Sequence, residues 1–281
     1  MGSNRHDIVR NQRIAKTSTL TSIFCNFESS GSQIASQPKI MSLFKENPFG
    51  HILFLKKWLI RLMGLATHQR YKGFNTLEIE GSEIIRSLPE SNVLFVSNHQ
   101  TYFADVVAMF HVFNASLKGR ENSIKNLGYL WSPKLNVYYV AASETMKESL
   151  LTKVMAYAGS VSIERTWRAD GHDVNRQVKM SDISKIGIAL NDGWVITFPQ
   201  GTTTPWKPLR KGTAHIIKKY QPIVVPVVID GFRRSFDKKG LRIKKKGILQ
   251  SIIIKEPLEI DYKNESFESI IEKLEYAIEQ H

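Results

Sequence analysis

The chain has 281 residues and 42% apolar composition, which predicts one domain with appendages rather than two equal domains. Its one cysteine, Cys25, excludes an intrachain disulfide and a cysteine-based zinc site, and it fits a reducing compartment. The net charge of +13 is concentrated in residues 205–246, which contain 13 Lys and Arg and two Asp. This basic stretch indicates an anionic partner, namely a membrane surface, an acidic carrier protein or nucleic acid. The alternative is a solvated surface without a partner.

The first 72 residues differ in character from the rest of the chain. Residues 1–40 are rich in Ser, Thr, Asn and Gln without sustained periodicity, so we expect disorder. The composition changes abruptly at Met41, and our hypothesis is that Met41 is the biological start and that residues 1–40 are an upstream extension. Mass spectrometry of the native N-terminus tests it, and a peptide covering residues 3–10 would contradict it.

Residues 41–72 are predicted to form an amphipathic helical segment. Its apolar run is interrupted by Lys56, Lys57 and Arg61, which gather on one side of a helix. The three cations oppose a membrane-spanning position and favour a helix that lies in a membrane interface. A helix packed on the domain is the alternative.

From residue 73 to residue 281, strand-like runs alternate with helical patterns. The candidate strands cover residues 76–80, 92–97, 136–142, 193–198, 222–229 and 250–256. The candidate helices follow residue 105, begin near residue 145, run from about 176 to 191, and close the chain from about 266 to 280. This alternation predicts an α/β domain whose functional sites lie at the carboxyl ends of strands.

The stretch "SNHQTYFAD", residues 97–105, joins a predicted strand to a predicted helix. A neutral imidazole at His99 can take a proton from a hydroxyl when a carboxylate fixes its tautomer, and Asp105 can do so from the start of the helix. A purely structural His–Asp pair is the alternative. No nucleophile elbow, phosphate-binding loop or dinucleotide fingerprint occurs. The sequence therefore favours a His base that activates a hydroxyl of the substrate.

Three further stretches contain polar residues near strand ends: "GSVSIERTWR" (159–168), "WVITFPQGTTTPWKPLRKGTAH" (194–215) and "PIVVPVVIDGFRR" (222–234). The blocks "NHQTYFAD", "GSVSIER", "FPQGT" and "VVPVVI", in this order and at these separations, resemble the glycerolipid acyltransferases of the 1-acylglycerol-3-phosphate acyltransferase family. The resemblance extends over roughly residues 75–232. It implies an α/β domain with a mixed sheet flanked by helices, which N-terminal helices dock on the membrane.

The resemblance also implies an activity and site residues. The activity is acyl transfer from a thioester, carried by acyl carrier protein or coenzyme A, to a lysolipid hydroxyl. By the resemblance, His99 is the general base, Asp105 orients it, and Arg165 contacts the anionic headgroup of the acceptor. Gly201 marks the turn whose backbone approaches the acceptor.

The first block departs from the family's pattern. Five residues rather than four separate His99 from Asp105, and one extra residue rotates a side chain on a helix by about 100°. Either the turn between strand and helix absorbs this residue, or His99 has another partner.

The third block departs as well, because Gln200, Gly201 and Thr202 are followed by threonine where the family has Glu-Gly-Thr-Arg. The missing arginine weakens the case for a phosphomonoester acceptor, since arginine is suited to bidentate phosphate binding. The cations that follow can compensate: Lys207, Arg210 and Lys211. A monoacylated amino-acid lipid is an alternative acceptor.

The sequence thus predicts a lipid O-acyltransferase of phospholipid biosynthesis on the cytoplasmic face of a membrane, with 1-acyl-sn-glycerol-3-phosphate as the first candidate acceptor. The expected partners are anionic lipids, an acyl-ACP or acyl-CoA donor and the lysolipid. We expect no metal or cofactor, and no nucleic acid, because no reader module accompanies the cations. A non-catalytic lipid-binding protein on the same fold is the alternative.

Overall fold

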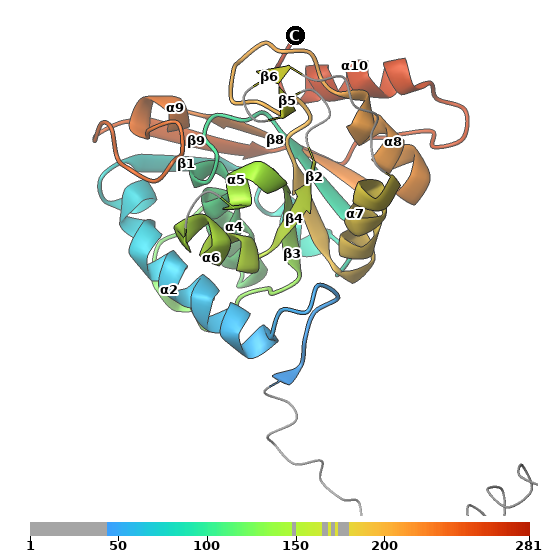
Figure 1. Cartoon of the computed structure of the whole chain (residues 1–281). Helices are drawn as coiled ribbons and strands as arrows, with labels where there is room; N and C mark the ends of the chain where they lie inside the picture. The colour runs from blue at the N-terminus through green and yellow to red at the C-terminus, as the bar shows by residue number, and fades with distance from the viewer. Residues whose placement is uncertain (1–43, 148–149, 165–167, 170–171, 174–179) are drawn as a thin grey trace, which may run out of the picture. The chain divides into compact units, whose positions relative to one another are not determined.

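The structure is a computed structural model that describes residues 44–147, 150–164, 168–169, 172–173 and 180–281 (Figure 1). The prediction of disorder for residues 1–40, and the hypothesis on Met41, fall outside the described residues.

A seven-stranded sheet forms the centre of the fold. Its order is β1-β9-β8-β2-β7-β3-β4, and its strands are β1 (Thr76–Glu80), β2 (Val93–Ser97), β3 (Val137–Ala142), β4 (Ser160–Ile163), β7 (Trp194–Thr197), β8 (Ile223–Asp230) and β9 (Leu249–Ile254). Neighbouring strands are parallel except for the antiparallel pair β8–β9. The predicted mixed sheet is therefore confirmed. Two short strands, β5 (Arg168–Ala169) and β6 (His172–Asp173), form a second sheet.

The central strands are buried on both faces. All five residues of β2 are buried; Val93 and Phe95 belong to the core on one face, and Leu94 and Val96 to the core on the other. Successive side chains of a strand point to opposite faces, so a continuous apolar run requires helices on both sides of the sheet.

Helices cover both faces, as Figure 1 shows. One core includes side chains from α2 (Leu53–Lys72), α3 (Ile84–Ser87), α4 (Ala104–Leu117), η2 (Leu127–Trp131), α5 (Ser143–Lys147), α6 (Leu150–Tyr157) and α9 (Phe232–Ser235). The other includes side chains from α7 (Met180–Asp192), α8 (Lys211–Tyr220) and α10 (Phe267–Ala277). Helices are present where the described residues were predicted to be helical, but the helix expected from near residue 145 is two helices, α5 and α6. Residues 176–179 of another predicted helix lie outside the described residues.

The orientation of α2 corrects one prediction. Lys56 is fully buried, with its Nζ atom 4.6 Å from the centroid of the Tyr138 ring, so the three cations do not share an outer face. The reason is that this helix has more apolar residues than one buried stripe can hold, while the aliphatic stem of a lysine packs well against a core. Five large apolar side chains remain exposed on α2: Phe54, Leu55, Trp58, Leu62 and Leu65. None of the described helices is both long and apolar enough to cross a bilayer.

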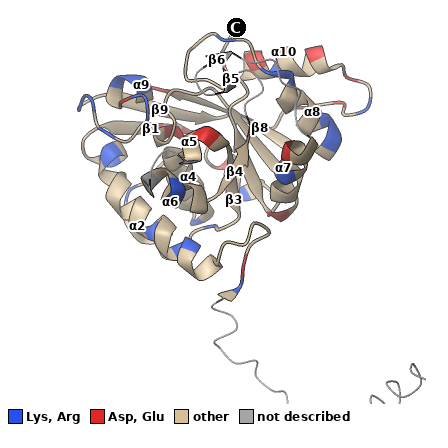
Figure 2. Cartoon of the chain, in the orientation of Figure 1, with Lys and Arg blue, Asp and Glu red and all other residues tan. Residues whose placement is uncertain are grey.

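A basic loop, residues 237–247, connects α9 to β9. Its exposed cations are Lys238, Lys239, Arg242, Lys244, Lys245 and Lys246, and Figure 2 shows cations gathered in this region and on α9. The loop is bonded to the turn that follows β2, because the N–H groups of Tyr102 and Phe103 donate to the carbonyls of Lys238 and Lys239, at 3.1 Å each.

Candidate active site

The carboxyl ends of three adjacent parallel strands, β8, β2 and β7, lie at one edge of the sheet. His99 lies in the turn after β2, Phe198 directly follows β7, and Asp230 ends β8. Because β2 is the middle strand of the three, His99 occupies the centre of this edge, which is where open α/β sheets bind their ligands.

His99 and Asp105 form a hydrogen-bonded pair. The His99 Nδ1 atom lies 3.0 Å from Asp105 Oδ2; the Asp105 side chain is fully buried, and that of His99 is 12% exposed. The same Oδ2 accepts from the N–H groups of Gln100 (2.7 Å) and Thr101 (2.9 Å), and the Thr101 hydroxyl donates to Oδ1 at 2.7 Å. The turn between strand and helix thus absorbs the extra residue.

This geometry sets the tautomer of His99. An ionised carboxylate only accepts hydrogen bonds, so Nδ1 carries the proton and Nε2 keeps a lone pair. The His99 ring stacks on that of Phe198, with the ring centroids 3.9 Å apart and the planes inclined by 20°. Both contacts hold the imidazole in one orientation, which a general base requires.

The turn that carries His99 is also fastened to β8. The Asn98 side chain donates to the Ile229 carbonyl and accepts from the Ile229 N–H, each at 2.8 Å. The Gln100 amide donates to the Ile229 carbonyl and to Asp230 Oδ1, both at 3.1 Å, and its Oε1 accepts from the Arg233 N–H at 3.0 Å. Two side chains flanking His99 therefore fix its backbone to the neighbouring strand.

A cavity of about 320 Å³ opens beside His99. It lies between the carboxyl ends of β3, β4 and β7, the turn after β7, and the beginning of α8. Its lining is mixed: apolar side chains such as Ile163, Ile183 and Ile216 alternate with polar ones. The charged and hydroxyl side chains of the lining are Glu164, Asp182, Arg210, Lys238, Tyr102, Tyr139, Thr145, Thr197, Thr202, Thr204 and Thr213.

The structure brings only part of the predicted substrate-binding set to this cavity. Gly201, Thr202 and Arg210 line it. Gly201 has a φ of +65°, and its N–H donates to the Phe198 carbonyl at 2.9 Å, so it forms the expected tight turn. Arg165 lies outside the described residues.

The other three predicted residues do not line the cavity. The Gln200 side chain is buried and donates to the Lys207 carbonyl (3.1 Å) and to Gln280 Oε1 (2.9 Å). The Lys207 side chain is exposed, and Lys211 forms an ion pair with Glu268 at 2.8 Å. Both lysines were predicted because they are cations close in sequence to the position of the missing arginine, and sequence proximity does not determine which side chains reach the cavity.

Sequence reasoning assigned no site role to Phe198, Tyr102 or Lys238. Lys238 lines the cavity because the basic loop is bonded to the His99 turn, a contact between segments more than 130 residues apart. No local pattern reports such a contact. Phe198 belongs to the quoted "FPQGT" block, so its position directly after a strand was the one available signal.

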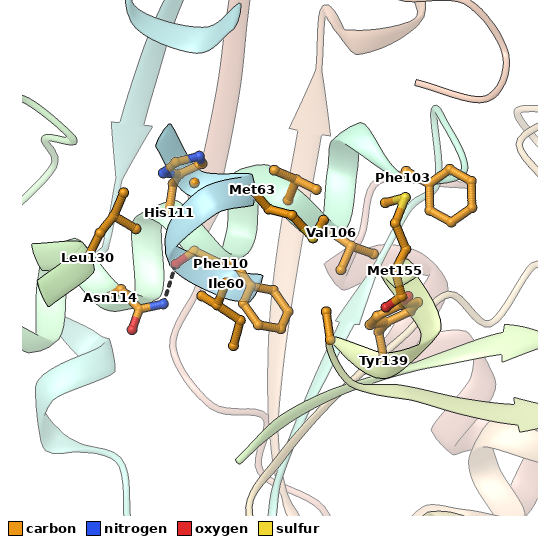
Figure 3. Close-up of a pocket in the computed structure, with 13 residues that line it drawn as sticks. Ile60, Met63, Phe103, Val106, Phe110, His111, Asn114, Leu130, Tyr139 and Met155 are labelled. Carbon is orange, nitrogen blue, oxygen red and sulfur yellow. Dashed lines mark hydrogen bonds between the residues drawn. The ribbon is translucent and has the colours of Figure 1, made fainter. Parts of the chain in front are cut away.

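A second, smaller cavity of about 40 Å³ lies between α2, α4, η2 and α6 (Figure 3). Its lining is almost entirely apolar: Ile60, Met63, Gly64, Phe103, Val106, Val107, Phe110, His111, Asn114, Leu130, Tyr139, Met155 and Ala158. Val106 and Tyr139 line both cavities, so the apolar cavity adjoins the one beside His99.

His111, which lines this apolar cavity, has a structural role. Its Nε2 lies 2.9 Å from Thr67 Oγ1 and its Nδ1 lies 2.8 Å from the Tyr129 hydroxyl. Burial lowers the pKa of His111 to about 3, so the ring is neutral and joins α2 to α4 and η2.

The sequence profile of the acyltransferase family matches residues 76–230, more than half of the chain. The chain belongs to the acyltransferase family. This acyltransferase is similar in fold to the crystal structure of the 1-acyl-sn-glycerophosphate (LPA) acyltransferase PlsC from Thermotoga maritima, with a TM-score of 0.51 and 22% sequence identity over 85% of this chain and 83% of that one. The search of curated proteins finds no match. The predicted family and enzyme class are thus confirmed.

Proposed function

We propose that this acyltransferase moves a fatty acyl group from a thioester donor to the hydroxyl of a lysolipid. The observation that carries the proposal is the His99–Asp105 pair, at 3.0 Å, beside a cavity that adjoins an apolar one. The intact pair also argues against the alternative of a lipid-binding protein whose altered spacing has disabled catalysis.

The geometry supports a direct transfer. His99 Nε2 takes the proton of the acceptor hydroxyl while the hydroxyl oxygen attacks the thioester carbonyl. The tetrahedral intermediate collapses by breaking the carbon–sulfur bond, and the leaving thiolate takes the proton back from the imidazolium. Asp105 stabilises that imidazolium through Nδ1. A positioned general base contributes roughly 10²–10⁴-fold to the rate, and binding both substrates side by side supplies proximity.

The apolar cavity is suited to hydrocarbon. Three of the 13 lining side chains carry polar atoms: His111, Asn114 and Tyr139. His111 is bonded to Thr67 and Tyr129, the Asn114 amide donates to the Phe110 carbonyl at 2.7 Å, and the Tyr139 hydroxyl donates to the Met155 carbonyl at 2.8 Å. Because these polar groups are already satisfied, an alkyl chain entering the cavity leaves no donor or acceptor unpaired. Its volume of about 40 Å³ suits a few methylene groups rather than a whole chain, so we propose that it receives the end of an acyl chain bound beside His99.

The substrates of such a reaction are amphiphiles, and two features support docking on the cytoplasmic face of a membrane. The outer side of α2 exposes Trp58, Leu62 and Leu65, which suits burial in the headgroup region. The basic loop adds exposed cations, each worth roughly 1 kcal/mol near an anionic surface. The α2 C-terminal turn and this loop are neighbours, since Arg70 Nη1 donates to the Leu241 carbonyl at 2.8 Å.

The acceptor is a lysolipid of phospholipid biosynthesis, with 1-acyl-sn-glycerol-3-phosphate as the first candidate, and the donor is acyl-ACP or acyl-CoA. A specific observation favours a second candidate acceptor, a monoacylated amino-acid lipid. Thr203 stands where the family has arginine; its side chain is buried, and it is not among the residues that line the cavity.

The test uses the purified full chain with acyl-ACP or acyl-CoA, and with lysophosphatidate and a lyso-amino-acid lipid as separate acceptors. His99→Ala is expected to lose about 10²-fold or more of the transfer rate. His215→Ala is the matched control, because His215 is exposed on α8 and packs on Phe267, with ring centroids 4.3 Å apart. Equal rates in the two variants would overturn the catalytic role of His99.

A further inference from the structure

We propose that Gln280, three residues after α10, is a positioning residue for acyl transfer, because its side chain holds residues 199–210 in their place beside the cavity. We call residues 199–210 the substrate turn. The inference rests on the proposed function and deepens it by naming a residue that acts on the site without lining the cavity.

The substrate turn forms one wall of the cavity that contains His99. Gly201, Thr202 and Thr204 line this cavity. Phe198, which directly precedes the turn, stacks on the His99 ring with the centroids 3.9 Å apart. A displacement of the turn therefore changes the shape of the space beside the general base, where both substrates must be aligned.

The substrate turn depends on contacts with other elements for its shape. Residues 199–210 form neither a helix nor a strand. Trp206 has a φ of +60°, a conformation that bulky residues rarely adopt and that persists only where the surroundings hold it. The Trp206 side chain is 66% exposed, so its packing does not supply that hold. Its N–H donates to Gln280 Oε1 at 3.2 Å.

The same oxygen of Gln280 binds a second part of the turn. The Gln200 Nε2 atom donates to Gln280 Oε1 at 2.9 Å and to the Lys207 carbonyl at 3.1 Å. Gln200 is only 1% exposed, so water competes little for these bonds. One acceptor atom thus joins the beginning of the turn, at residue 200, to its far side, at residue 206.

Gln280 is itself held in one orientation. Its N–H donates to the Glu275 carbonyl at 3.0 Å, and its Nε2 donates to the Glu279 carbonyl at 2.7 Å, which directs Oε1 toward the turn. Ile278, two residues earlier, is fully buried in the core with α10. Glu275 Oε1 adds a further contact by accepting from the Leu209 N–H at 3.1 Å.

The amide at position 200, where the family has glutamate, matches Gln280. Both described partners of Gln200 Nε2 are acceptors, and Gln200 Oε1 is buried without a hydrogen-bond partner among the described residues. A glutamate at this position would bring a buried carboxylate to two acceptors, which is costly. Rotation of the Gln280 amide would provide a donor but would take Oε1 away from the Trp206 N–H.

The experiment uses the full chain and compares Gln280→Met, which removes the accepting oxygen, with Gln280→Glu, which keeps it. His281→Ala is the matched control, because His281 is the next residue, is exposed, and stacks on Tyr276 with ring centroids 5.2 Å apart. Gln200→Glu is measured alone and together with Gln280→Met. The readouts are kcat and KM for lysophosphatidate at a fixed donor concentration, the Kd for that lipid by calorimetry, and amide hydrogen exchange.

We expect Gln280→Met to raise the acceptor KM about tenfold or more and to leave Gln280→Glu and His281→Ala within about twofold of the wild type. Amide exchange should become faster in residues 201–209 and not in the strands of the sheet. The pH dependence of kcat/KM should not change, because the contacts of the His99–Asp105 pair are intact. Gln200→Glu should be less harmful in the Gln280→Met background, where one opposing acceptor is absent.

Faster exchange of the substrate turn with an unchanged acceptor KM and Kd would overturn the positioning role, and so would equal losses in Gln280→Glu and Gln280→Met. A loss of kcat without a change in KM, in proportion to a lower free energy of unfolding, would also overturn it. A weaker Kd and faster exchange of the turn, confined to Gln280→Met, in an enzyme that transfers no acyl group to any lysolipid would uphold the positioning role and reject the proposed function.

Discussion

Replacing Lys56 by methionine is expected to stabilise this acyltransferase at neutral pH. Lys56 is fully buried, and no described atom forms a hydrogen bond with its Nζ. Burial lowers the pKa of Lys56 from 10.5 to about 8, against the opposing attraction of Asp192. The ring of Tyr138, 4.6 Å from Nζ, is its remaining compensation.

The pKa sets both the magnitude and the direction of the effect. The difference between 10.5 and about 8 corresponds to about 3 kcal/mol, since one pKa unit is worth about 1.4 kcal/mol. Below pH 8 the ammonium is charged in both states and the full cost falls on the folded state. Between pH 8 and 10.5 the unfolded state binds more protons, so stability rises with pH. Removing the amine also removes a cation–π contact worth about 1 kcal/mol, which leaves a gain of about 2 kcal/mol.

The measurement is urea denaturation of the wild type, Lys56→Met and Lys57→Met at pH 7 and at pH 10.5. Lys57 is the matched control because it is the next residue of α2 and its side chain is only partly buried. We expect Lys56→Met to raise the free energy of unfolding by about 2 kcal/mol at pH 7, with the gain disappearing at the higher pH. A variant that is less stable than the wild type at both pH values would refute the reasoning and show that the ammonium is well satisfied.

Three other predictions concern the pair, its support and the membrane. Asp105→Ala is expected to lower kcat by roughly 10²-fold or more with a cooperative unfolding transition retained; transfer within tenfold of the wild type would contradict the role of the pair. Asn98→Ala removes the partner of the buried Ile229 N–H, while Gln100 still donates to the Ile229 carbonyl; it should cost about 1–3 kcal/mol in urea denaturation, a loss under 0.5 kcal/mol being the contrary result. The double change Leu62→Glu and Leu65→Glu should abolish co-sedimentation with anionic vesicles, while Leu249→Glu, at an exposed position on β9, should not; equal binding would exclude α2 as the docking surface.

Most of the sheet was predictable because its strands are continuous apolar runs bounded by turns. A strand that is buried on both faces of a sheet is apolar at nearly every position. β2 and β8 are such strands. The positions of His99 and Asp105 followed from the same rule, since they border the end of a strand. Whether they touch did not follow, because the answer depends on the backbone of Gln100 and Thr101, whose N–H groups turn toward the carboxylate.

The sequence did not predict which side of α2 packs against the domain. α2 is apolar around most of its circumference, so its periodicity did not determine which side the domain would cover, and Lys56 was placed outside. Lys238 was counted as one surface cation among many, because its approach to the site depends on a distant loop. For Arg165, the structure offers no comparison, since that residue lies outside the described part of the chain.

The attachment of the basic loop to the turn after β2 has a consequence for engineering. Gly240 has a φ of +74°, and a Cβ there would lie 2.5 Å from the backbone nitrogen of Ala104, so the tip of the loop and the first residue of α4 have interlocking shapes. Chimeras that exchange this loop between related enzymes must therefore exchange the His99 turn with it.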